Sequence, residues 1–172
     1  AASRLGAVTI TSANNVSVNN ISAASLTQSA GSGVTTLGNI TTNSTSPSFA
    51  GGAVSLTSGV LNITGGIDAR GDGVTSGQAG GNVSLTASTG NVTVGAVDTS
   101  GGAGQTGPGG AGGDVFLAAS SGSVVLNGNV TTDGGGSTTG AKAVGGRVTF
   151  ASPVVVAAPL TLSTSGGNGT AA

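Results

Sequence analysis

The feature that most constrains this chain is a repeat of about 18 residues that occurs six times. Residues 81–99 read GNVSLTASTGNVTVGAVDT, and residues 113–132 read GDVFLAASSGSVVLNGNVTT. The other copies cover residues 6–23, 24–42, 52–69 and 146–162. Repetition at this short period is typical of solenoids, in which each unit buries its apolar face only against its neighbours.

Each copy contains three short segments in which apolar and polar residues alternate, as in strands with one buried face. Gly, Asn or Ser separates the segments and turns the chain. The expected core columns are Ile10, Leu26, Leu56, Leu85, Leu117 and Phe150 for the first segment, Val18, Leu37, Ile63, Val94, Leu126 and Val156 for the second, and Ile21, Ile40, Ile67, Val97, Val130 and Leu160 for the third.

Such short strands bury little surface alone, but stacked copies pair in parallel and enclose the three columns. We therefore predict an all-β, right-handed parallel β-helix (β-solenoid) of about six rungs, each with three short strands. At about 4.8 Å per rung the stack is on the order of 30 Å long. The whole chain, residues 1–172, is expected to be a single solenoid segment, with short early rungs at 5–42 and insert-bearing rungs at 50–172.

The last four copies carry glycine-rich inserts after the third segment. They are residues 70–80, 100–112 and 133–145, and one that begins at Ser163. Small residues recur at every third position, as in Gly101, Gly104 and Gly107. This period matches the three residues per turn of a polyproline II helix. Two interpretations stay open: flexible loops, or a side layer of polyproline II segments that leave from one corner of the solenoid.

The composition excludes several classes of function. The sequence contains no Cys, His or Glu, so disulfide frameworks, zinc sites and thiol chemistry are not expected. Four Lys and Arg against five Asp give a net charge of −1, without the basic surface that binds nucleic acid. No apolar run approaches the 18 residues of a membrane-spanning helix. We expect no catalytic residues, no cofactor and no metal, and hence no enzyme.

The pattern in residues 80–102, GGNVSLTASTGNVTVGAVDTSGG, resembles the repeats of filamentous-haemagglutinin-like large exoproteins. These are secreted bacterial β-helices of the two-partner or autotransporter kind. The resemblance covers nearly the whole chain and implies an extracellular or cell-surface location and a role in fibres or adhesins. The long glycine-rich inserts and the low charge depart from the family pattern, and residues 1–172 contain no segment that resembles the family's secretion domain. The repeat motif specifies a fold better than a function.

Two sets of charged residues are candidates for a site. Asp68 and Asp98 are expected at the same outward position on successive rungs, with Arg70 nearby. Paired carboxylates can act on a sugar or hold Ca²⁺. The favoured interpretation is a solvated strand edge whose charge Arg70 balances. Asp114 and Arg147 also share one position on adjacent rungs, and an exposed ion pair is expected there.

Three apolar residues, Phe116, Val125 and Val155, are expected to point outward. They are either isolated exposed side chains or a candidate lateral interface with another chain or a folded-back segment. Outward Ser and Thr columns suggest an ice-binding face, but Phe116 and Val125 interrupt them.

Neither end of the sequence offers a polar cap, which a solenoid needs to cover its terminal rungs. We therefore expect either a segment of a longer solenoid or head-to-tail stacking of copies, which generates filaments. The expected function is structural: an extracellular fibre or adhesin stalk whose main partner is the chain itself or neighbouring repeats. The alternative is a module that binds a cell-surface carbohydrate or ice. A polysaccharide-degrading β-helix enzyme is the weakest candidate, because the five Asp residues are scattered.

Overall fold

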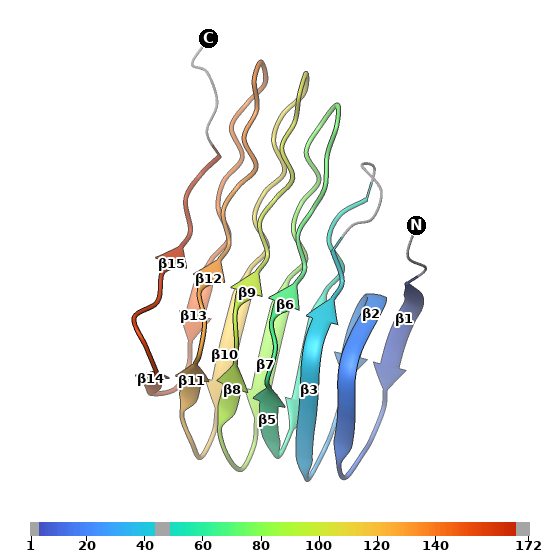
Figure 1. Cartoon of the computed structure of the whole chain (residues 1–172), viewed down its shortest axis with the longest axis vertical. Coiled ribbons are helices and arrows are strands. Elements are labelled where there is room, and N and C mark those ends of the chain that lie inside the picture. Colours follow the sequence, from blue (N-terminus) through green and yellow to red (C-terminus); the bar gives the residue numbers. More distant parts are fainter. Residues whose placement is uncertain (1–3, 44–48, 168–172) are drawn as a thin grey trace.

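A computed structural model describes residues 4–43 and 49–167, which form strands and turns without any helix (Figure 1). The strands are β1 (Leu5–Ile10), β2 (Val16–Gln28), β3 (Val34–Thr41), β4 (Val54–Ser58), β5 (Val60–Ile63), β6 (Ile67–Asp68), β7 (Val83–Ala87), β8 (Val92–Val94), β9 (Val97–Asp98), β10 (Val115–Ala119), β11 (Val124–Leu126), β12 (Val130–Thr131), β13 (Val148–Phe150), β14 (Val154–Val156) and β15 (Leu162–Ser163). All the pairings between these strands are parallel. The predicted all-β solenoid with parallel pairing is therefore confirmed.

Two walls of stacked strands enclose the core. The first wall runs in the order β1, β2, β4, β7, β10 and β13. The second wall runs in the order β2, β3, β5, β8, β11 and β14, with the short strands β6, β9, β12 and β15 beside it. Strand β2 belongs to both walls, because the chain passes from Val16 to Gln28 without a break at the corner.

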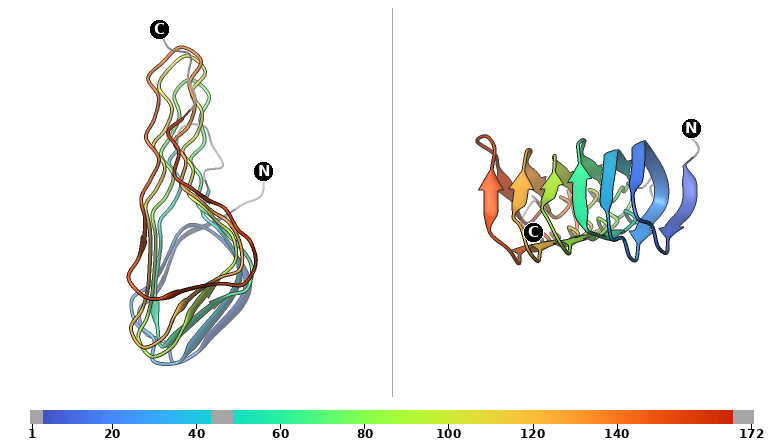
Figure 2. Two further views of the ribbon diagram at one scale, coloured as in Figure 1. Left: turned by 90° about the vertical axis from the view of Figure 1, so that its left-hand side faces the viewer. Right: turned by 90° about the horizontal axis from the view of Figure 1, so that it is seen from below.

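The solenoid makes about five turns, where the sequence predicts about six rungs. The six copies supply the six successive strands of the first wall, but only five pairings join them. The prediction counts the six copies of the repeat, whereas the number of turns corresponds to the five steps between them. Seen along its axis, the molecule has a closed, roughly triangular cross-section from which a narrow extension projects (Figure 2).

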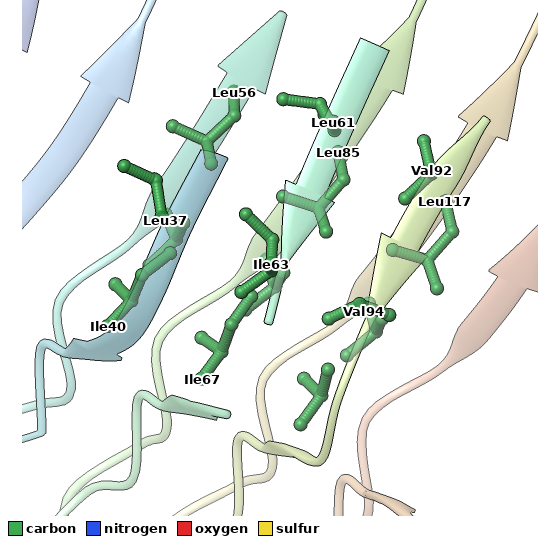
Figure 3. Close-up of a cluster of buried hydrophobic side chains, with 14 of the residues drawn as sticks. Leu37, Ile40, Leu56, Leu61, Ile63, Ile67, Leu85, Val92, Val94 and Leu117 are labelled. Atoms are coloured by element: carbon green, nitrogen blue, oxygen red, sulfur yellow. The ribbon is translucent and has the colours of Figure 1, made fainter. Parts of the chain in front are cut away.

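The interior is a continuous column of aliphatic side chains. Leu56, Leu85 and Leu117 from the first wall face Ile63 and Val94 from the second (Figure 3). These five side chains are almost completely buried. The alternation of apolar and polar residues produces this arrangement, because successive side chains of a strand point to opposite faces. Each rung therefore buries its apolar residues only against its own opposite wall and the rungs next to it.

Candidate functional site

The structure places most of the expected core residues in the interior. Buried positions are Leu26, Leu56, Leu85, Leu117, Leu37, Ile63, Val94, Leu126, Ile21, Ile40, Ile67, Val97 and Val130. The remaining five, Ile10, Phe150, Val18, Val156 and Leu160, lie on the first or last rungs and are half-buried or exposed. The second column is in register throughout, from Val18 to Val156.

Two of the expected column alignments are wrong. Leu26 pairs with Val54, and the residue opposite Leu56 is Gln28. Both alignments keep the apolar side chains inside, since they differ by two residues, so alternation alone does not distinguish them. In the third column, Val130 pairs with Leu162 instead of Leu160. The last rung has five residues between β14 and β15, where the rung before it has three between β11 and β12.

The candidate lateral interface is divided between two walls. Val125 and Val155 are adjacent on the outer face of the second wall. Phe116 lies on the first wall, between Ser84 and Thr149. Because both walls direct their apolar residues into one shared core, their outer faces point away from each other. Phe116 and Val155 are 40% and 49% exposed, so both side chains are accessible, but they do not form one surface.

The inserts project from one corner as long two-limbed arms that lie side by side (Figures 1 and 2). Backbone hydrogen bonds join each arm to the next with nearly constant spacing. The bonds from amide to carbonyl are Gly71 to Ser100, Gly77 to Pro108, Gly80 to Ala111, Gly101 to Asp133, Gly104 to Gly136, Gly109 to Ala141, Gly112 to Val144 and Gly134 to Ser165. Further bonds join the two limbs of one arm, as from Gly110 to Gly102. The arms therefore form an ordered, hydrogen-bonded layer.

The glycines of this layer lie where backbones approach closely. A Cβ atom on Gly110 would overlap the carbonyl oxygen of Gln78, and one on Gly102 would overlap that of Asp72. None of the described residues, glycines included, has a positive φ. The three-residue spacing, negative φ and bonding between segments favour polyproline II over independent flexible loops. That conformation stays a prediction, and for the last insert residues 168–172 lie outside the described residues.

Asp68 and Asp98 pair on adjacent strands, as expected, and Arg70 binds both carboxylates. Its Nε and Nη2 atoms donate to the two oxygens of Asp68, each at 2.9 Å, and its Nε lies 3.7 Å from Asp98 Oδ2. The hydrogen bond to Asp68 raises the pKa of the Arg70 guanidinium. Asn43 donates to Asp68 and Ser100 to Asp98.

The carboxylates line a shallow depression of about 330 Å³ on the outer face. Both oxygens of Asp68 already accept hydrogen bonds from Arg70, so they are poorly placed to act as a nucleophile or a metal ligand. Within residues 4–43 and 49–167, no three metal-ligating side chains lie together. The geometry favours a charge-balanced strand edge over a sugar-cleaving or calcium site.

The prediction of an Asp114–Arg147 ion pair is wrong. The two residues are neighbours, but they make a different contact. Asp114 Oδ1 accepts from the backbone N–H of Arg147 at 2.7 Å. No ion pair joins the two side chains in the part of the chain that the structure describes. The contact between the two residues therefore runs from the Arg147 backbone to the Asp114 side chain rather than between the two charged groups.

This contact belongs to a series, here called the corner ladder, that the sequence analysis missed. In each case a side-chain oxygen accepts from a backbone N–H one rung further along the chain. The pairs are Asn15 to Val34, Asn20 to Asn39, Asn39 to Gly66, Asn82 to Asp114, Asn91 to Ser123, Asp114 to Arg147, Asn129 to Thr161 and Asp133 to Ser165. The signal in the sequence is an Asn or Asp directly before a strand, as at Asn82, Asn91, Asp114 and Asn129, whereas Asn20 and Asn39 lie within β2 and β3.

The fold defines the chain as a β-solenoid with a side layer of glycine-rich arms. No family model, no curated protein and no solved structure matched the chain in comparisons with known proteins. No helix of the described residues could cross a membrane.

Proposed function

We propose that this chain is a non-catalytic structural protein of an extracellular or cell-surface fibre or adhesin stalk. It assembles by continued stacking of solenoid rungs, from further copies or from neighbouring repeats of a longer array. The observation that carries the proposal is that the hydrogen bonds of the structure run along the solenoid axis. Strand ladders, the corner ladder and the bonds between arms all run from one rung to the next.

The terminal rungs expose apolar side chains that a further rung would bury. Val156 and Leu162 lie on the last rung and are 50% and 49% exposed. At the other end, Leu5 and Val18 are 62% and 39% exposed. These side chains continue the apolar columns of the core, beside the unpaired edges of β1, β13 and β14. Head-to-tail contact between such unlike ends is heterologous and generates filaments when it does not close.

The low charge supports assembly. With charged residues at 5% of the chain, copies can pack closely with little electrostatic repulsion. The resemblance to secreted bacterial β-helices supports the extracellular location. The outward hydroxyl column that would favour ice binding is interrupted, since Phe116 stands between Ser84 and Thr149.

Electron microscopy and analytical ultracentrifugation of the purified chain over a range of concentrations test the proposal. We expect elongated assemblies with a repeat of about 4.8 Å along their axis. Val156→Asp places a charge in an apolar column at the end of the stack and should abolish assembly. Thr149→Asp, on the outer face of the same rung, is the matched control and should still assemble.

Compact, monodisperse monomers at every concentration would contradict assembly from separate copies. Binding of such monomers to particular sugars on a glycan array would instead support the alternative, a surface-binding module.

A further inference from the structure

The corner between β11 and β12 has the sequence Asn127–Gly128–Asn129. Among the asparagines that the structure describes, only Asn127 is followed directly by glycine. Most of the others precede Val or Ile, whose branched side chain crowds the backbone amide of its own residue. Glycine has no side chain, so nothing shields the Gly128 amide nitrogen from the side chain of the residue before it.

The side chain of Asn127 is not held by the rest of the molecule. Asn127 is exposed, and its carboxamide makes no hydrogen bond within the described part of the chain. The corner ladder engages Asn91 and Asn129, which accept from backbone amides at 3.0 and 2.9 Å. On the adjacent rungs, Gly95 and Ala157 occupy the position of Asn127 and offer no polar side chain to it. The Asn127 carboxamide can therefore turn toward the next backbone amide.

The backbone N–H of Gly128 is also without a hydrogen-bond partner among residues 4–43 and 49–167. Three residues join β11 to β12, one more than the two residues that join β8 to β9. The amides on both sides of this corner are bonded. The Asn127 N–H donates to the Val94 carbonyl at 2.9 Å, and the Val130 N–H donates to the Thr161 carbonyl at 3.0 Å. The amide at the centre of the corner is left unbonded.

We propose that Asn127 is a site of spontaneous deamidation, in which the chain modifies itself through the Gly128 amide. The Gly128 nitrogen attacks Asn127 Cγ, so that a new C–N bond forms and the Cγ–Nδ2 bond breaks. The NH₂ group leaves with the Gly128 amide proton as ammonia, and a cyclic succinimide remains. Water then opens the ring. Breaking the new C–N bond gives aspartate, and breaking the bond to the main-chain carbonyl carbon gives isoaspartate.

Asn62 has a similarly unbonded side chain but should not react. It makes no side-chain hydrogen bond within the described residues, and Ile63 follows it. Ile63 lies inside β5, which pairs with a strand on each side. The attacking nitrogen would therefore be part of a strand ladder and would carry a branched side chain. An unbonded carboxamide alone does not make a reactive site, since the next amide must be accessible as well.

Deamidation changes both the charge and the backbone length of this corner. The product carries one further negative charge on a chain whose net charge is −1. In isoaspartate the main chain runs through Cγ, so the corner gains a methylene group between the buried residues Leu126 and Val130. This inference concerns one corner of a single chain and does not depend on the proposed function.

Peptide mapping by tandem mass spectrometry tests the proposal on the folded natural chain, incubated at neutral and at mildly alkaline pH. Among the described asparagines, we expect Asn127 to convert first and to give both aspartate and isoaspartate. Conversion should be faster at the higher pH, because the Gly128 nitrogen attacks in its deprotonated form. Asn62 and Asn91 should stay unchanged in the same samples. The mapping also separates Asn127 from the other Asn–Gly pair of the sequence, Asn168–Gly169, which lies outside the described residues.

Two matched variants check the assignment. Asn127→Gln lengthens the side chain by one methylene, so attack requires a larger and less favourable ring, and conversion at this position should be lost. Asn62→Gln makes the same change at the control position and should leave conversion at Asn127 unaltered.

No conversion at Asn127 in the folded chain would overturn the proposal, whether or not the chain unfolded in urea converts there. Aspartate without isoaspartate would equally overturn it, because direct hydrolysis of the carboxamide by water gives aspartate alone. Conversion of Asn62 as fast as that of Asn127 would show that the open corner has no part in the reaction.

Discussion

At the scale of single residues, the described glycines of this chain, which has 35 glycines in all, let backbones approach closely rather than adopt unusual backbone angles. Glycine usually marks a turn that needs positive φ, yet no described glycine adopts it. Many instead lie against a carbonyl of the next rung or the next arm, where a Cβ atom has no room. The sequence reveals the three-residue spacing of these glycines, but not which backbone each one faces.

Alanine should have different effects at a crowded glycine and at an uncrowded one. Gly110→Ala forces a Cβ atom against the Gln78 carbonyl and should destabilise the chain by about 1–3 kcal/mol. Gly6→Ala has nothing within 4 Å of its Cβ atom and a permitted φ. It should be neutral, or stabilise by about 0.4–1 kcal/mol through the unfolded state. Urea unfolding measures both, and equal destabilisation by the two variants would contradict this role of glycine.

At the scale of strands, alternation in the sequence predicts which residues face inward but only partly predicts register. The second column is right in all six copies. Leu26 is displaced by two residues because Gln28, a polar residue, occupies a core position. Leu160 is displaced because the last rung has a longer connection before Leu162.

The corner ladder is also a property of these elements, and hydrogen exchange can test it. Asn91→Ala removes the acceptor for the Ser123 amide, which it binds at 3.0 Å. We expect a loss of about 1 kcal/mol and faster exchange of that amide. Asn91→Asp keeps an oxygen acceptor and should restore most of the protection. Asn62→Ala is the control, since Asn62 makes no side-chain hydrogen bond within the described residues. Unchanged exchange at Ser123 in Asn91→Ala would show that the ladder contributes nothing.

The candidate charged site was partly predictable from the sequence. The shared position of Asp68 and Asp98 follows from the repeat, and Arg70 is close in sequence. How Arg70 distributes its contacts between the two carboxylates is not predictable, because this depends on the side-chain conformation of Arg70. The corner contact of Asp114 was missed for a related reason. A carboxylate beside an arginine suggests an ion pair, while the need of the Arg147 backbone amide for a side-chain acceptor is invisible in a sequence.

At the scale of the whole molecule, stability should vary along the solenoid axis, because each rung contacts only its neighbours. Leu85→Ala, in a fully buried central rung, should cost about 2–5 kcal/mol. Val156→Ala, in the half-exposed last rung, should cost less than about 1 kcal/mol. Chemical denaturation compares them. Equal losses would show that the stack does not depend on position in this way.

The direction of the bonds between rungs and between arms also has a mechanical consequence. The polypeptide runs around the axis, so a pulling force along the axis does not act along the covalent chain. It acts on the hydrogen bonds of one gap between rungs, all of which carry the load together. The arms add their own bonds, such as Gly77 to Pro108 and Gly109 to Ala141, to the same gaps. The glycine-rich layer therefore acts as a second load-bearing seam beside the solenoid, and a fibre built this way breaks at its least-bonded gap.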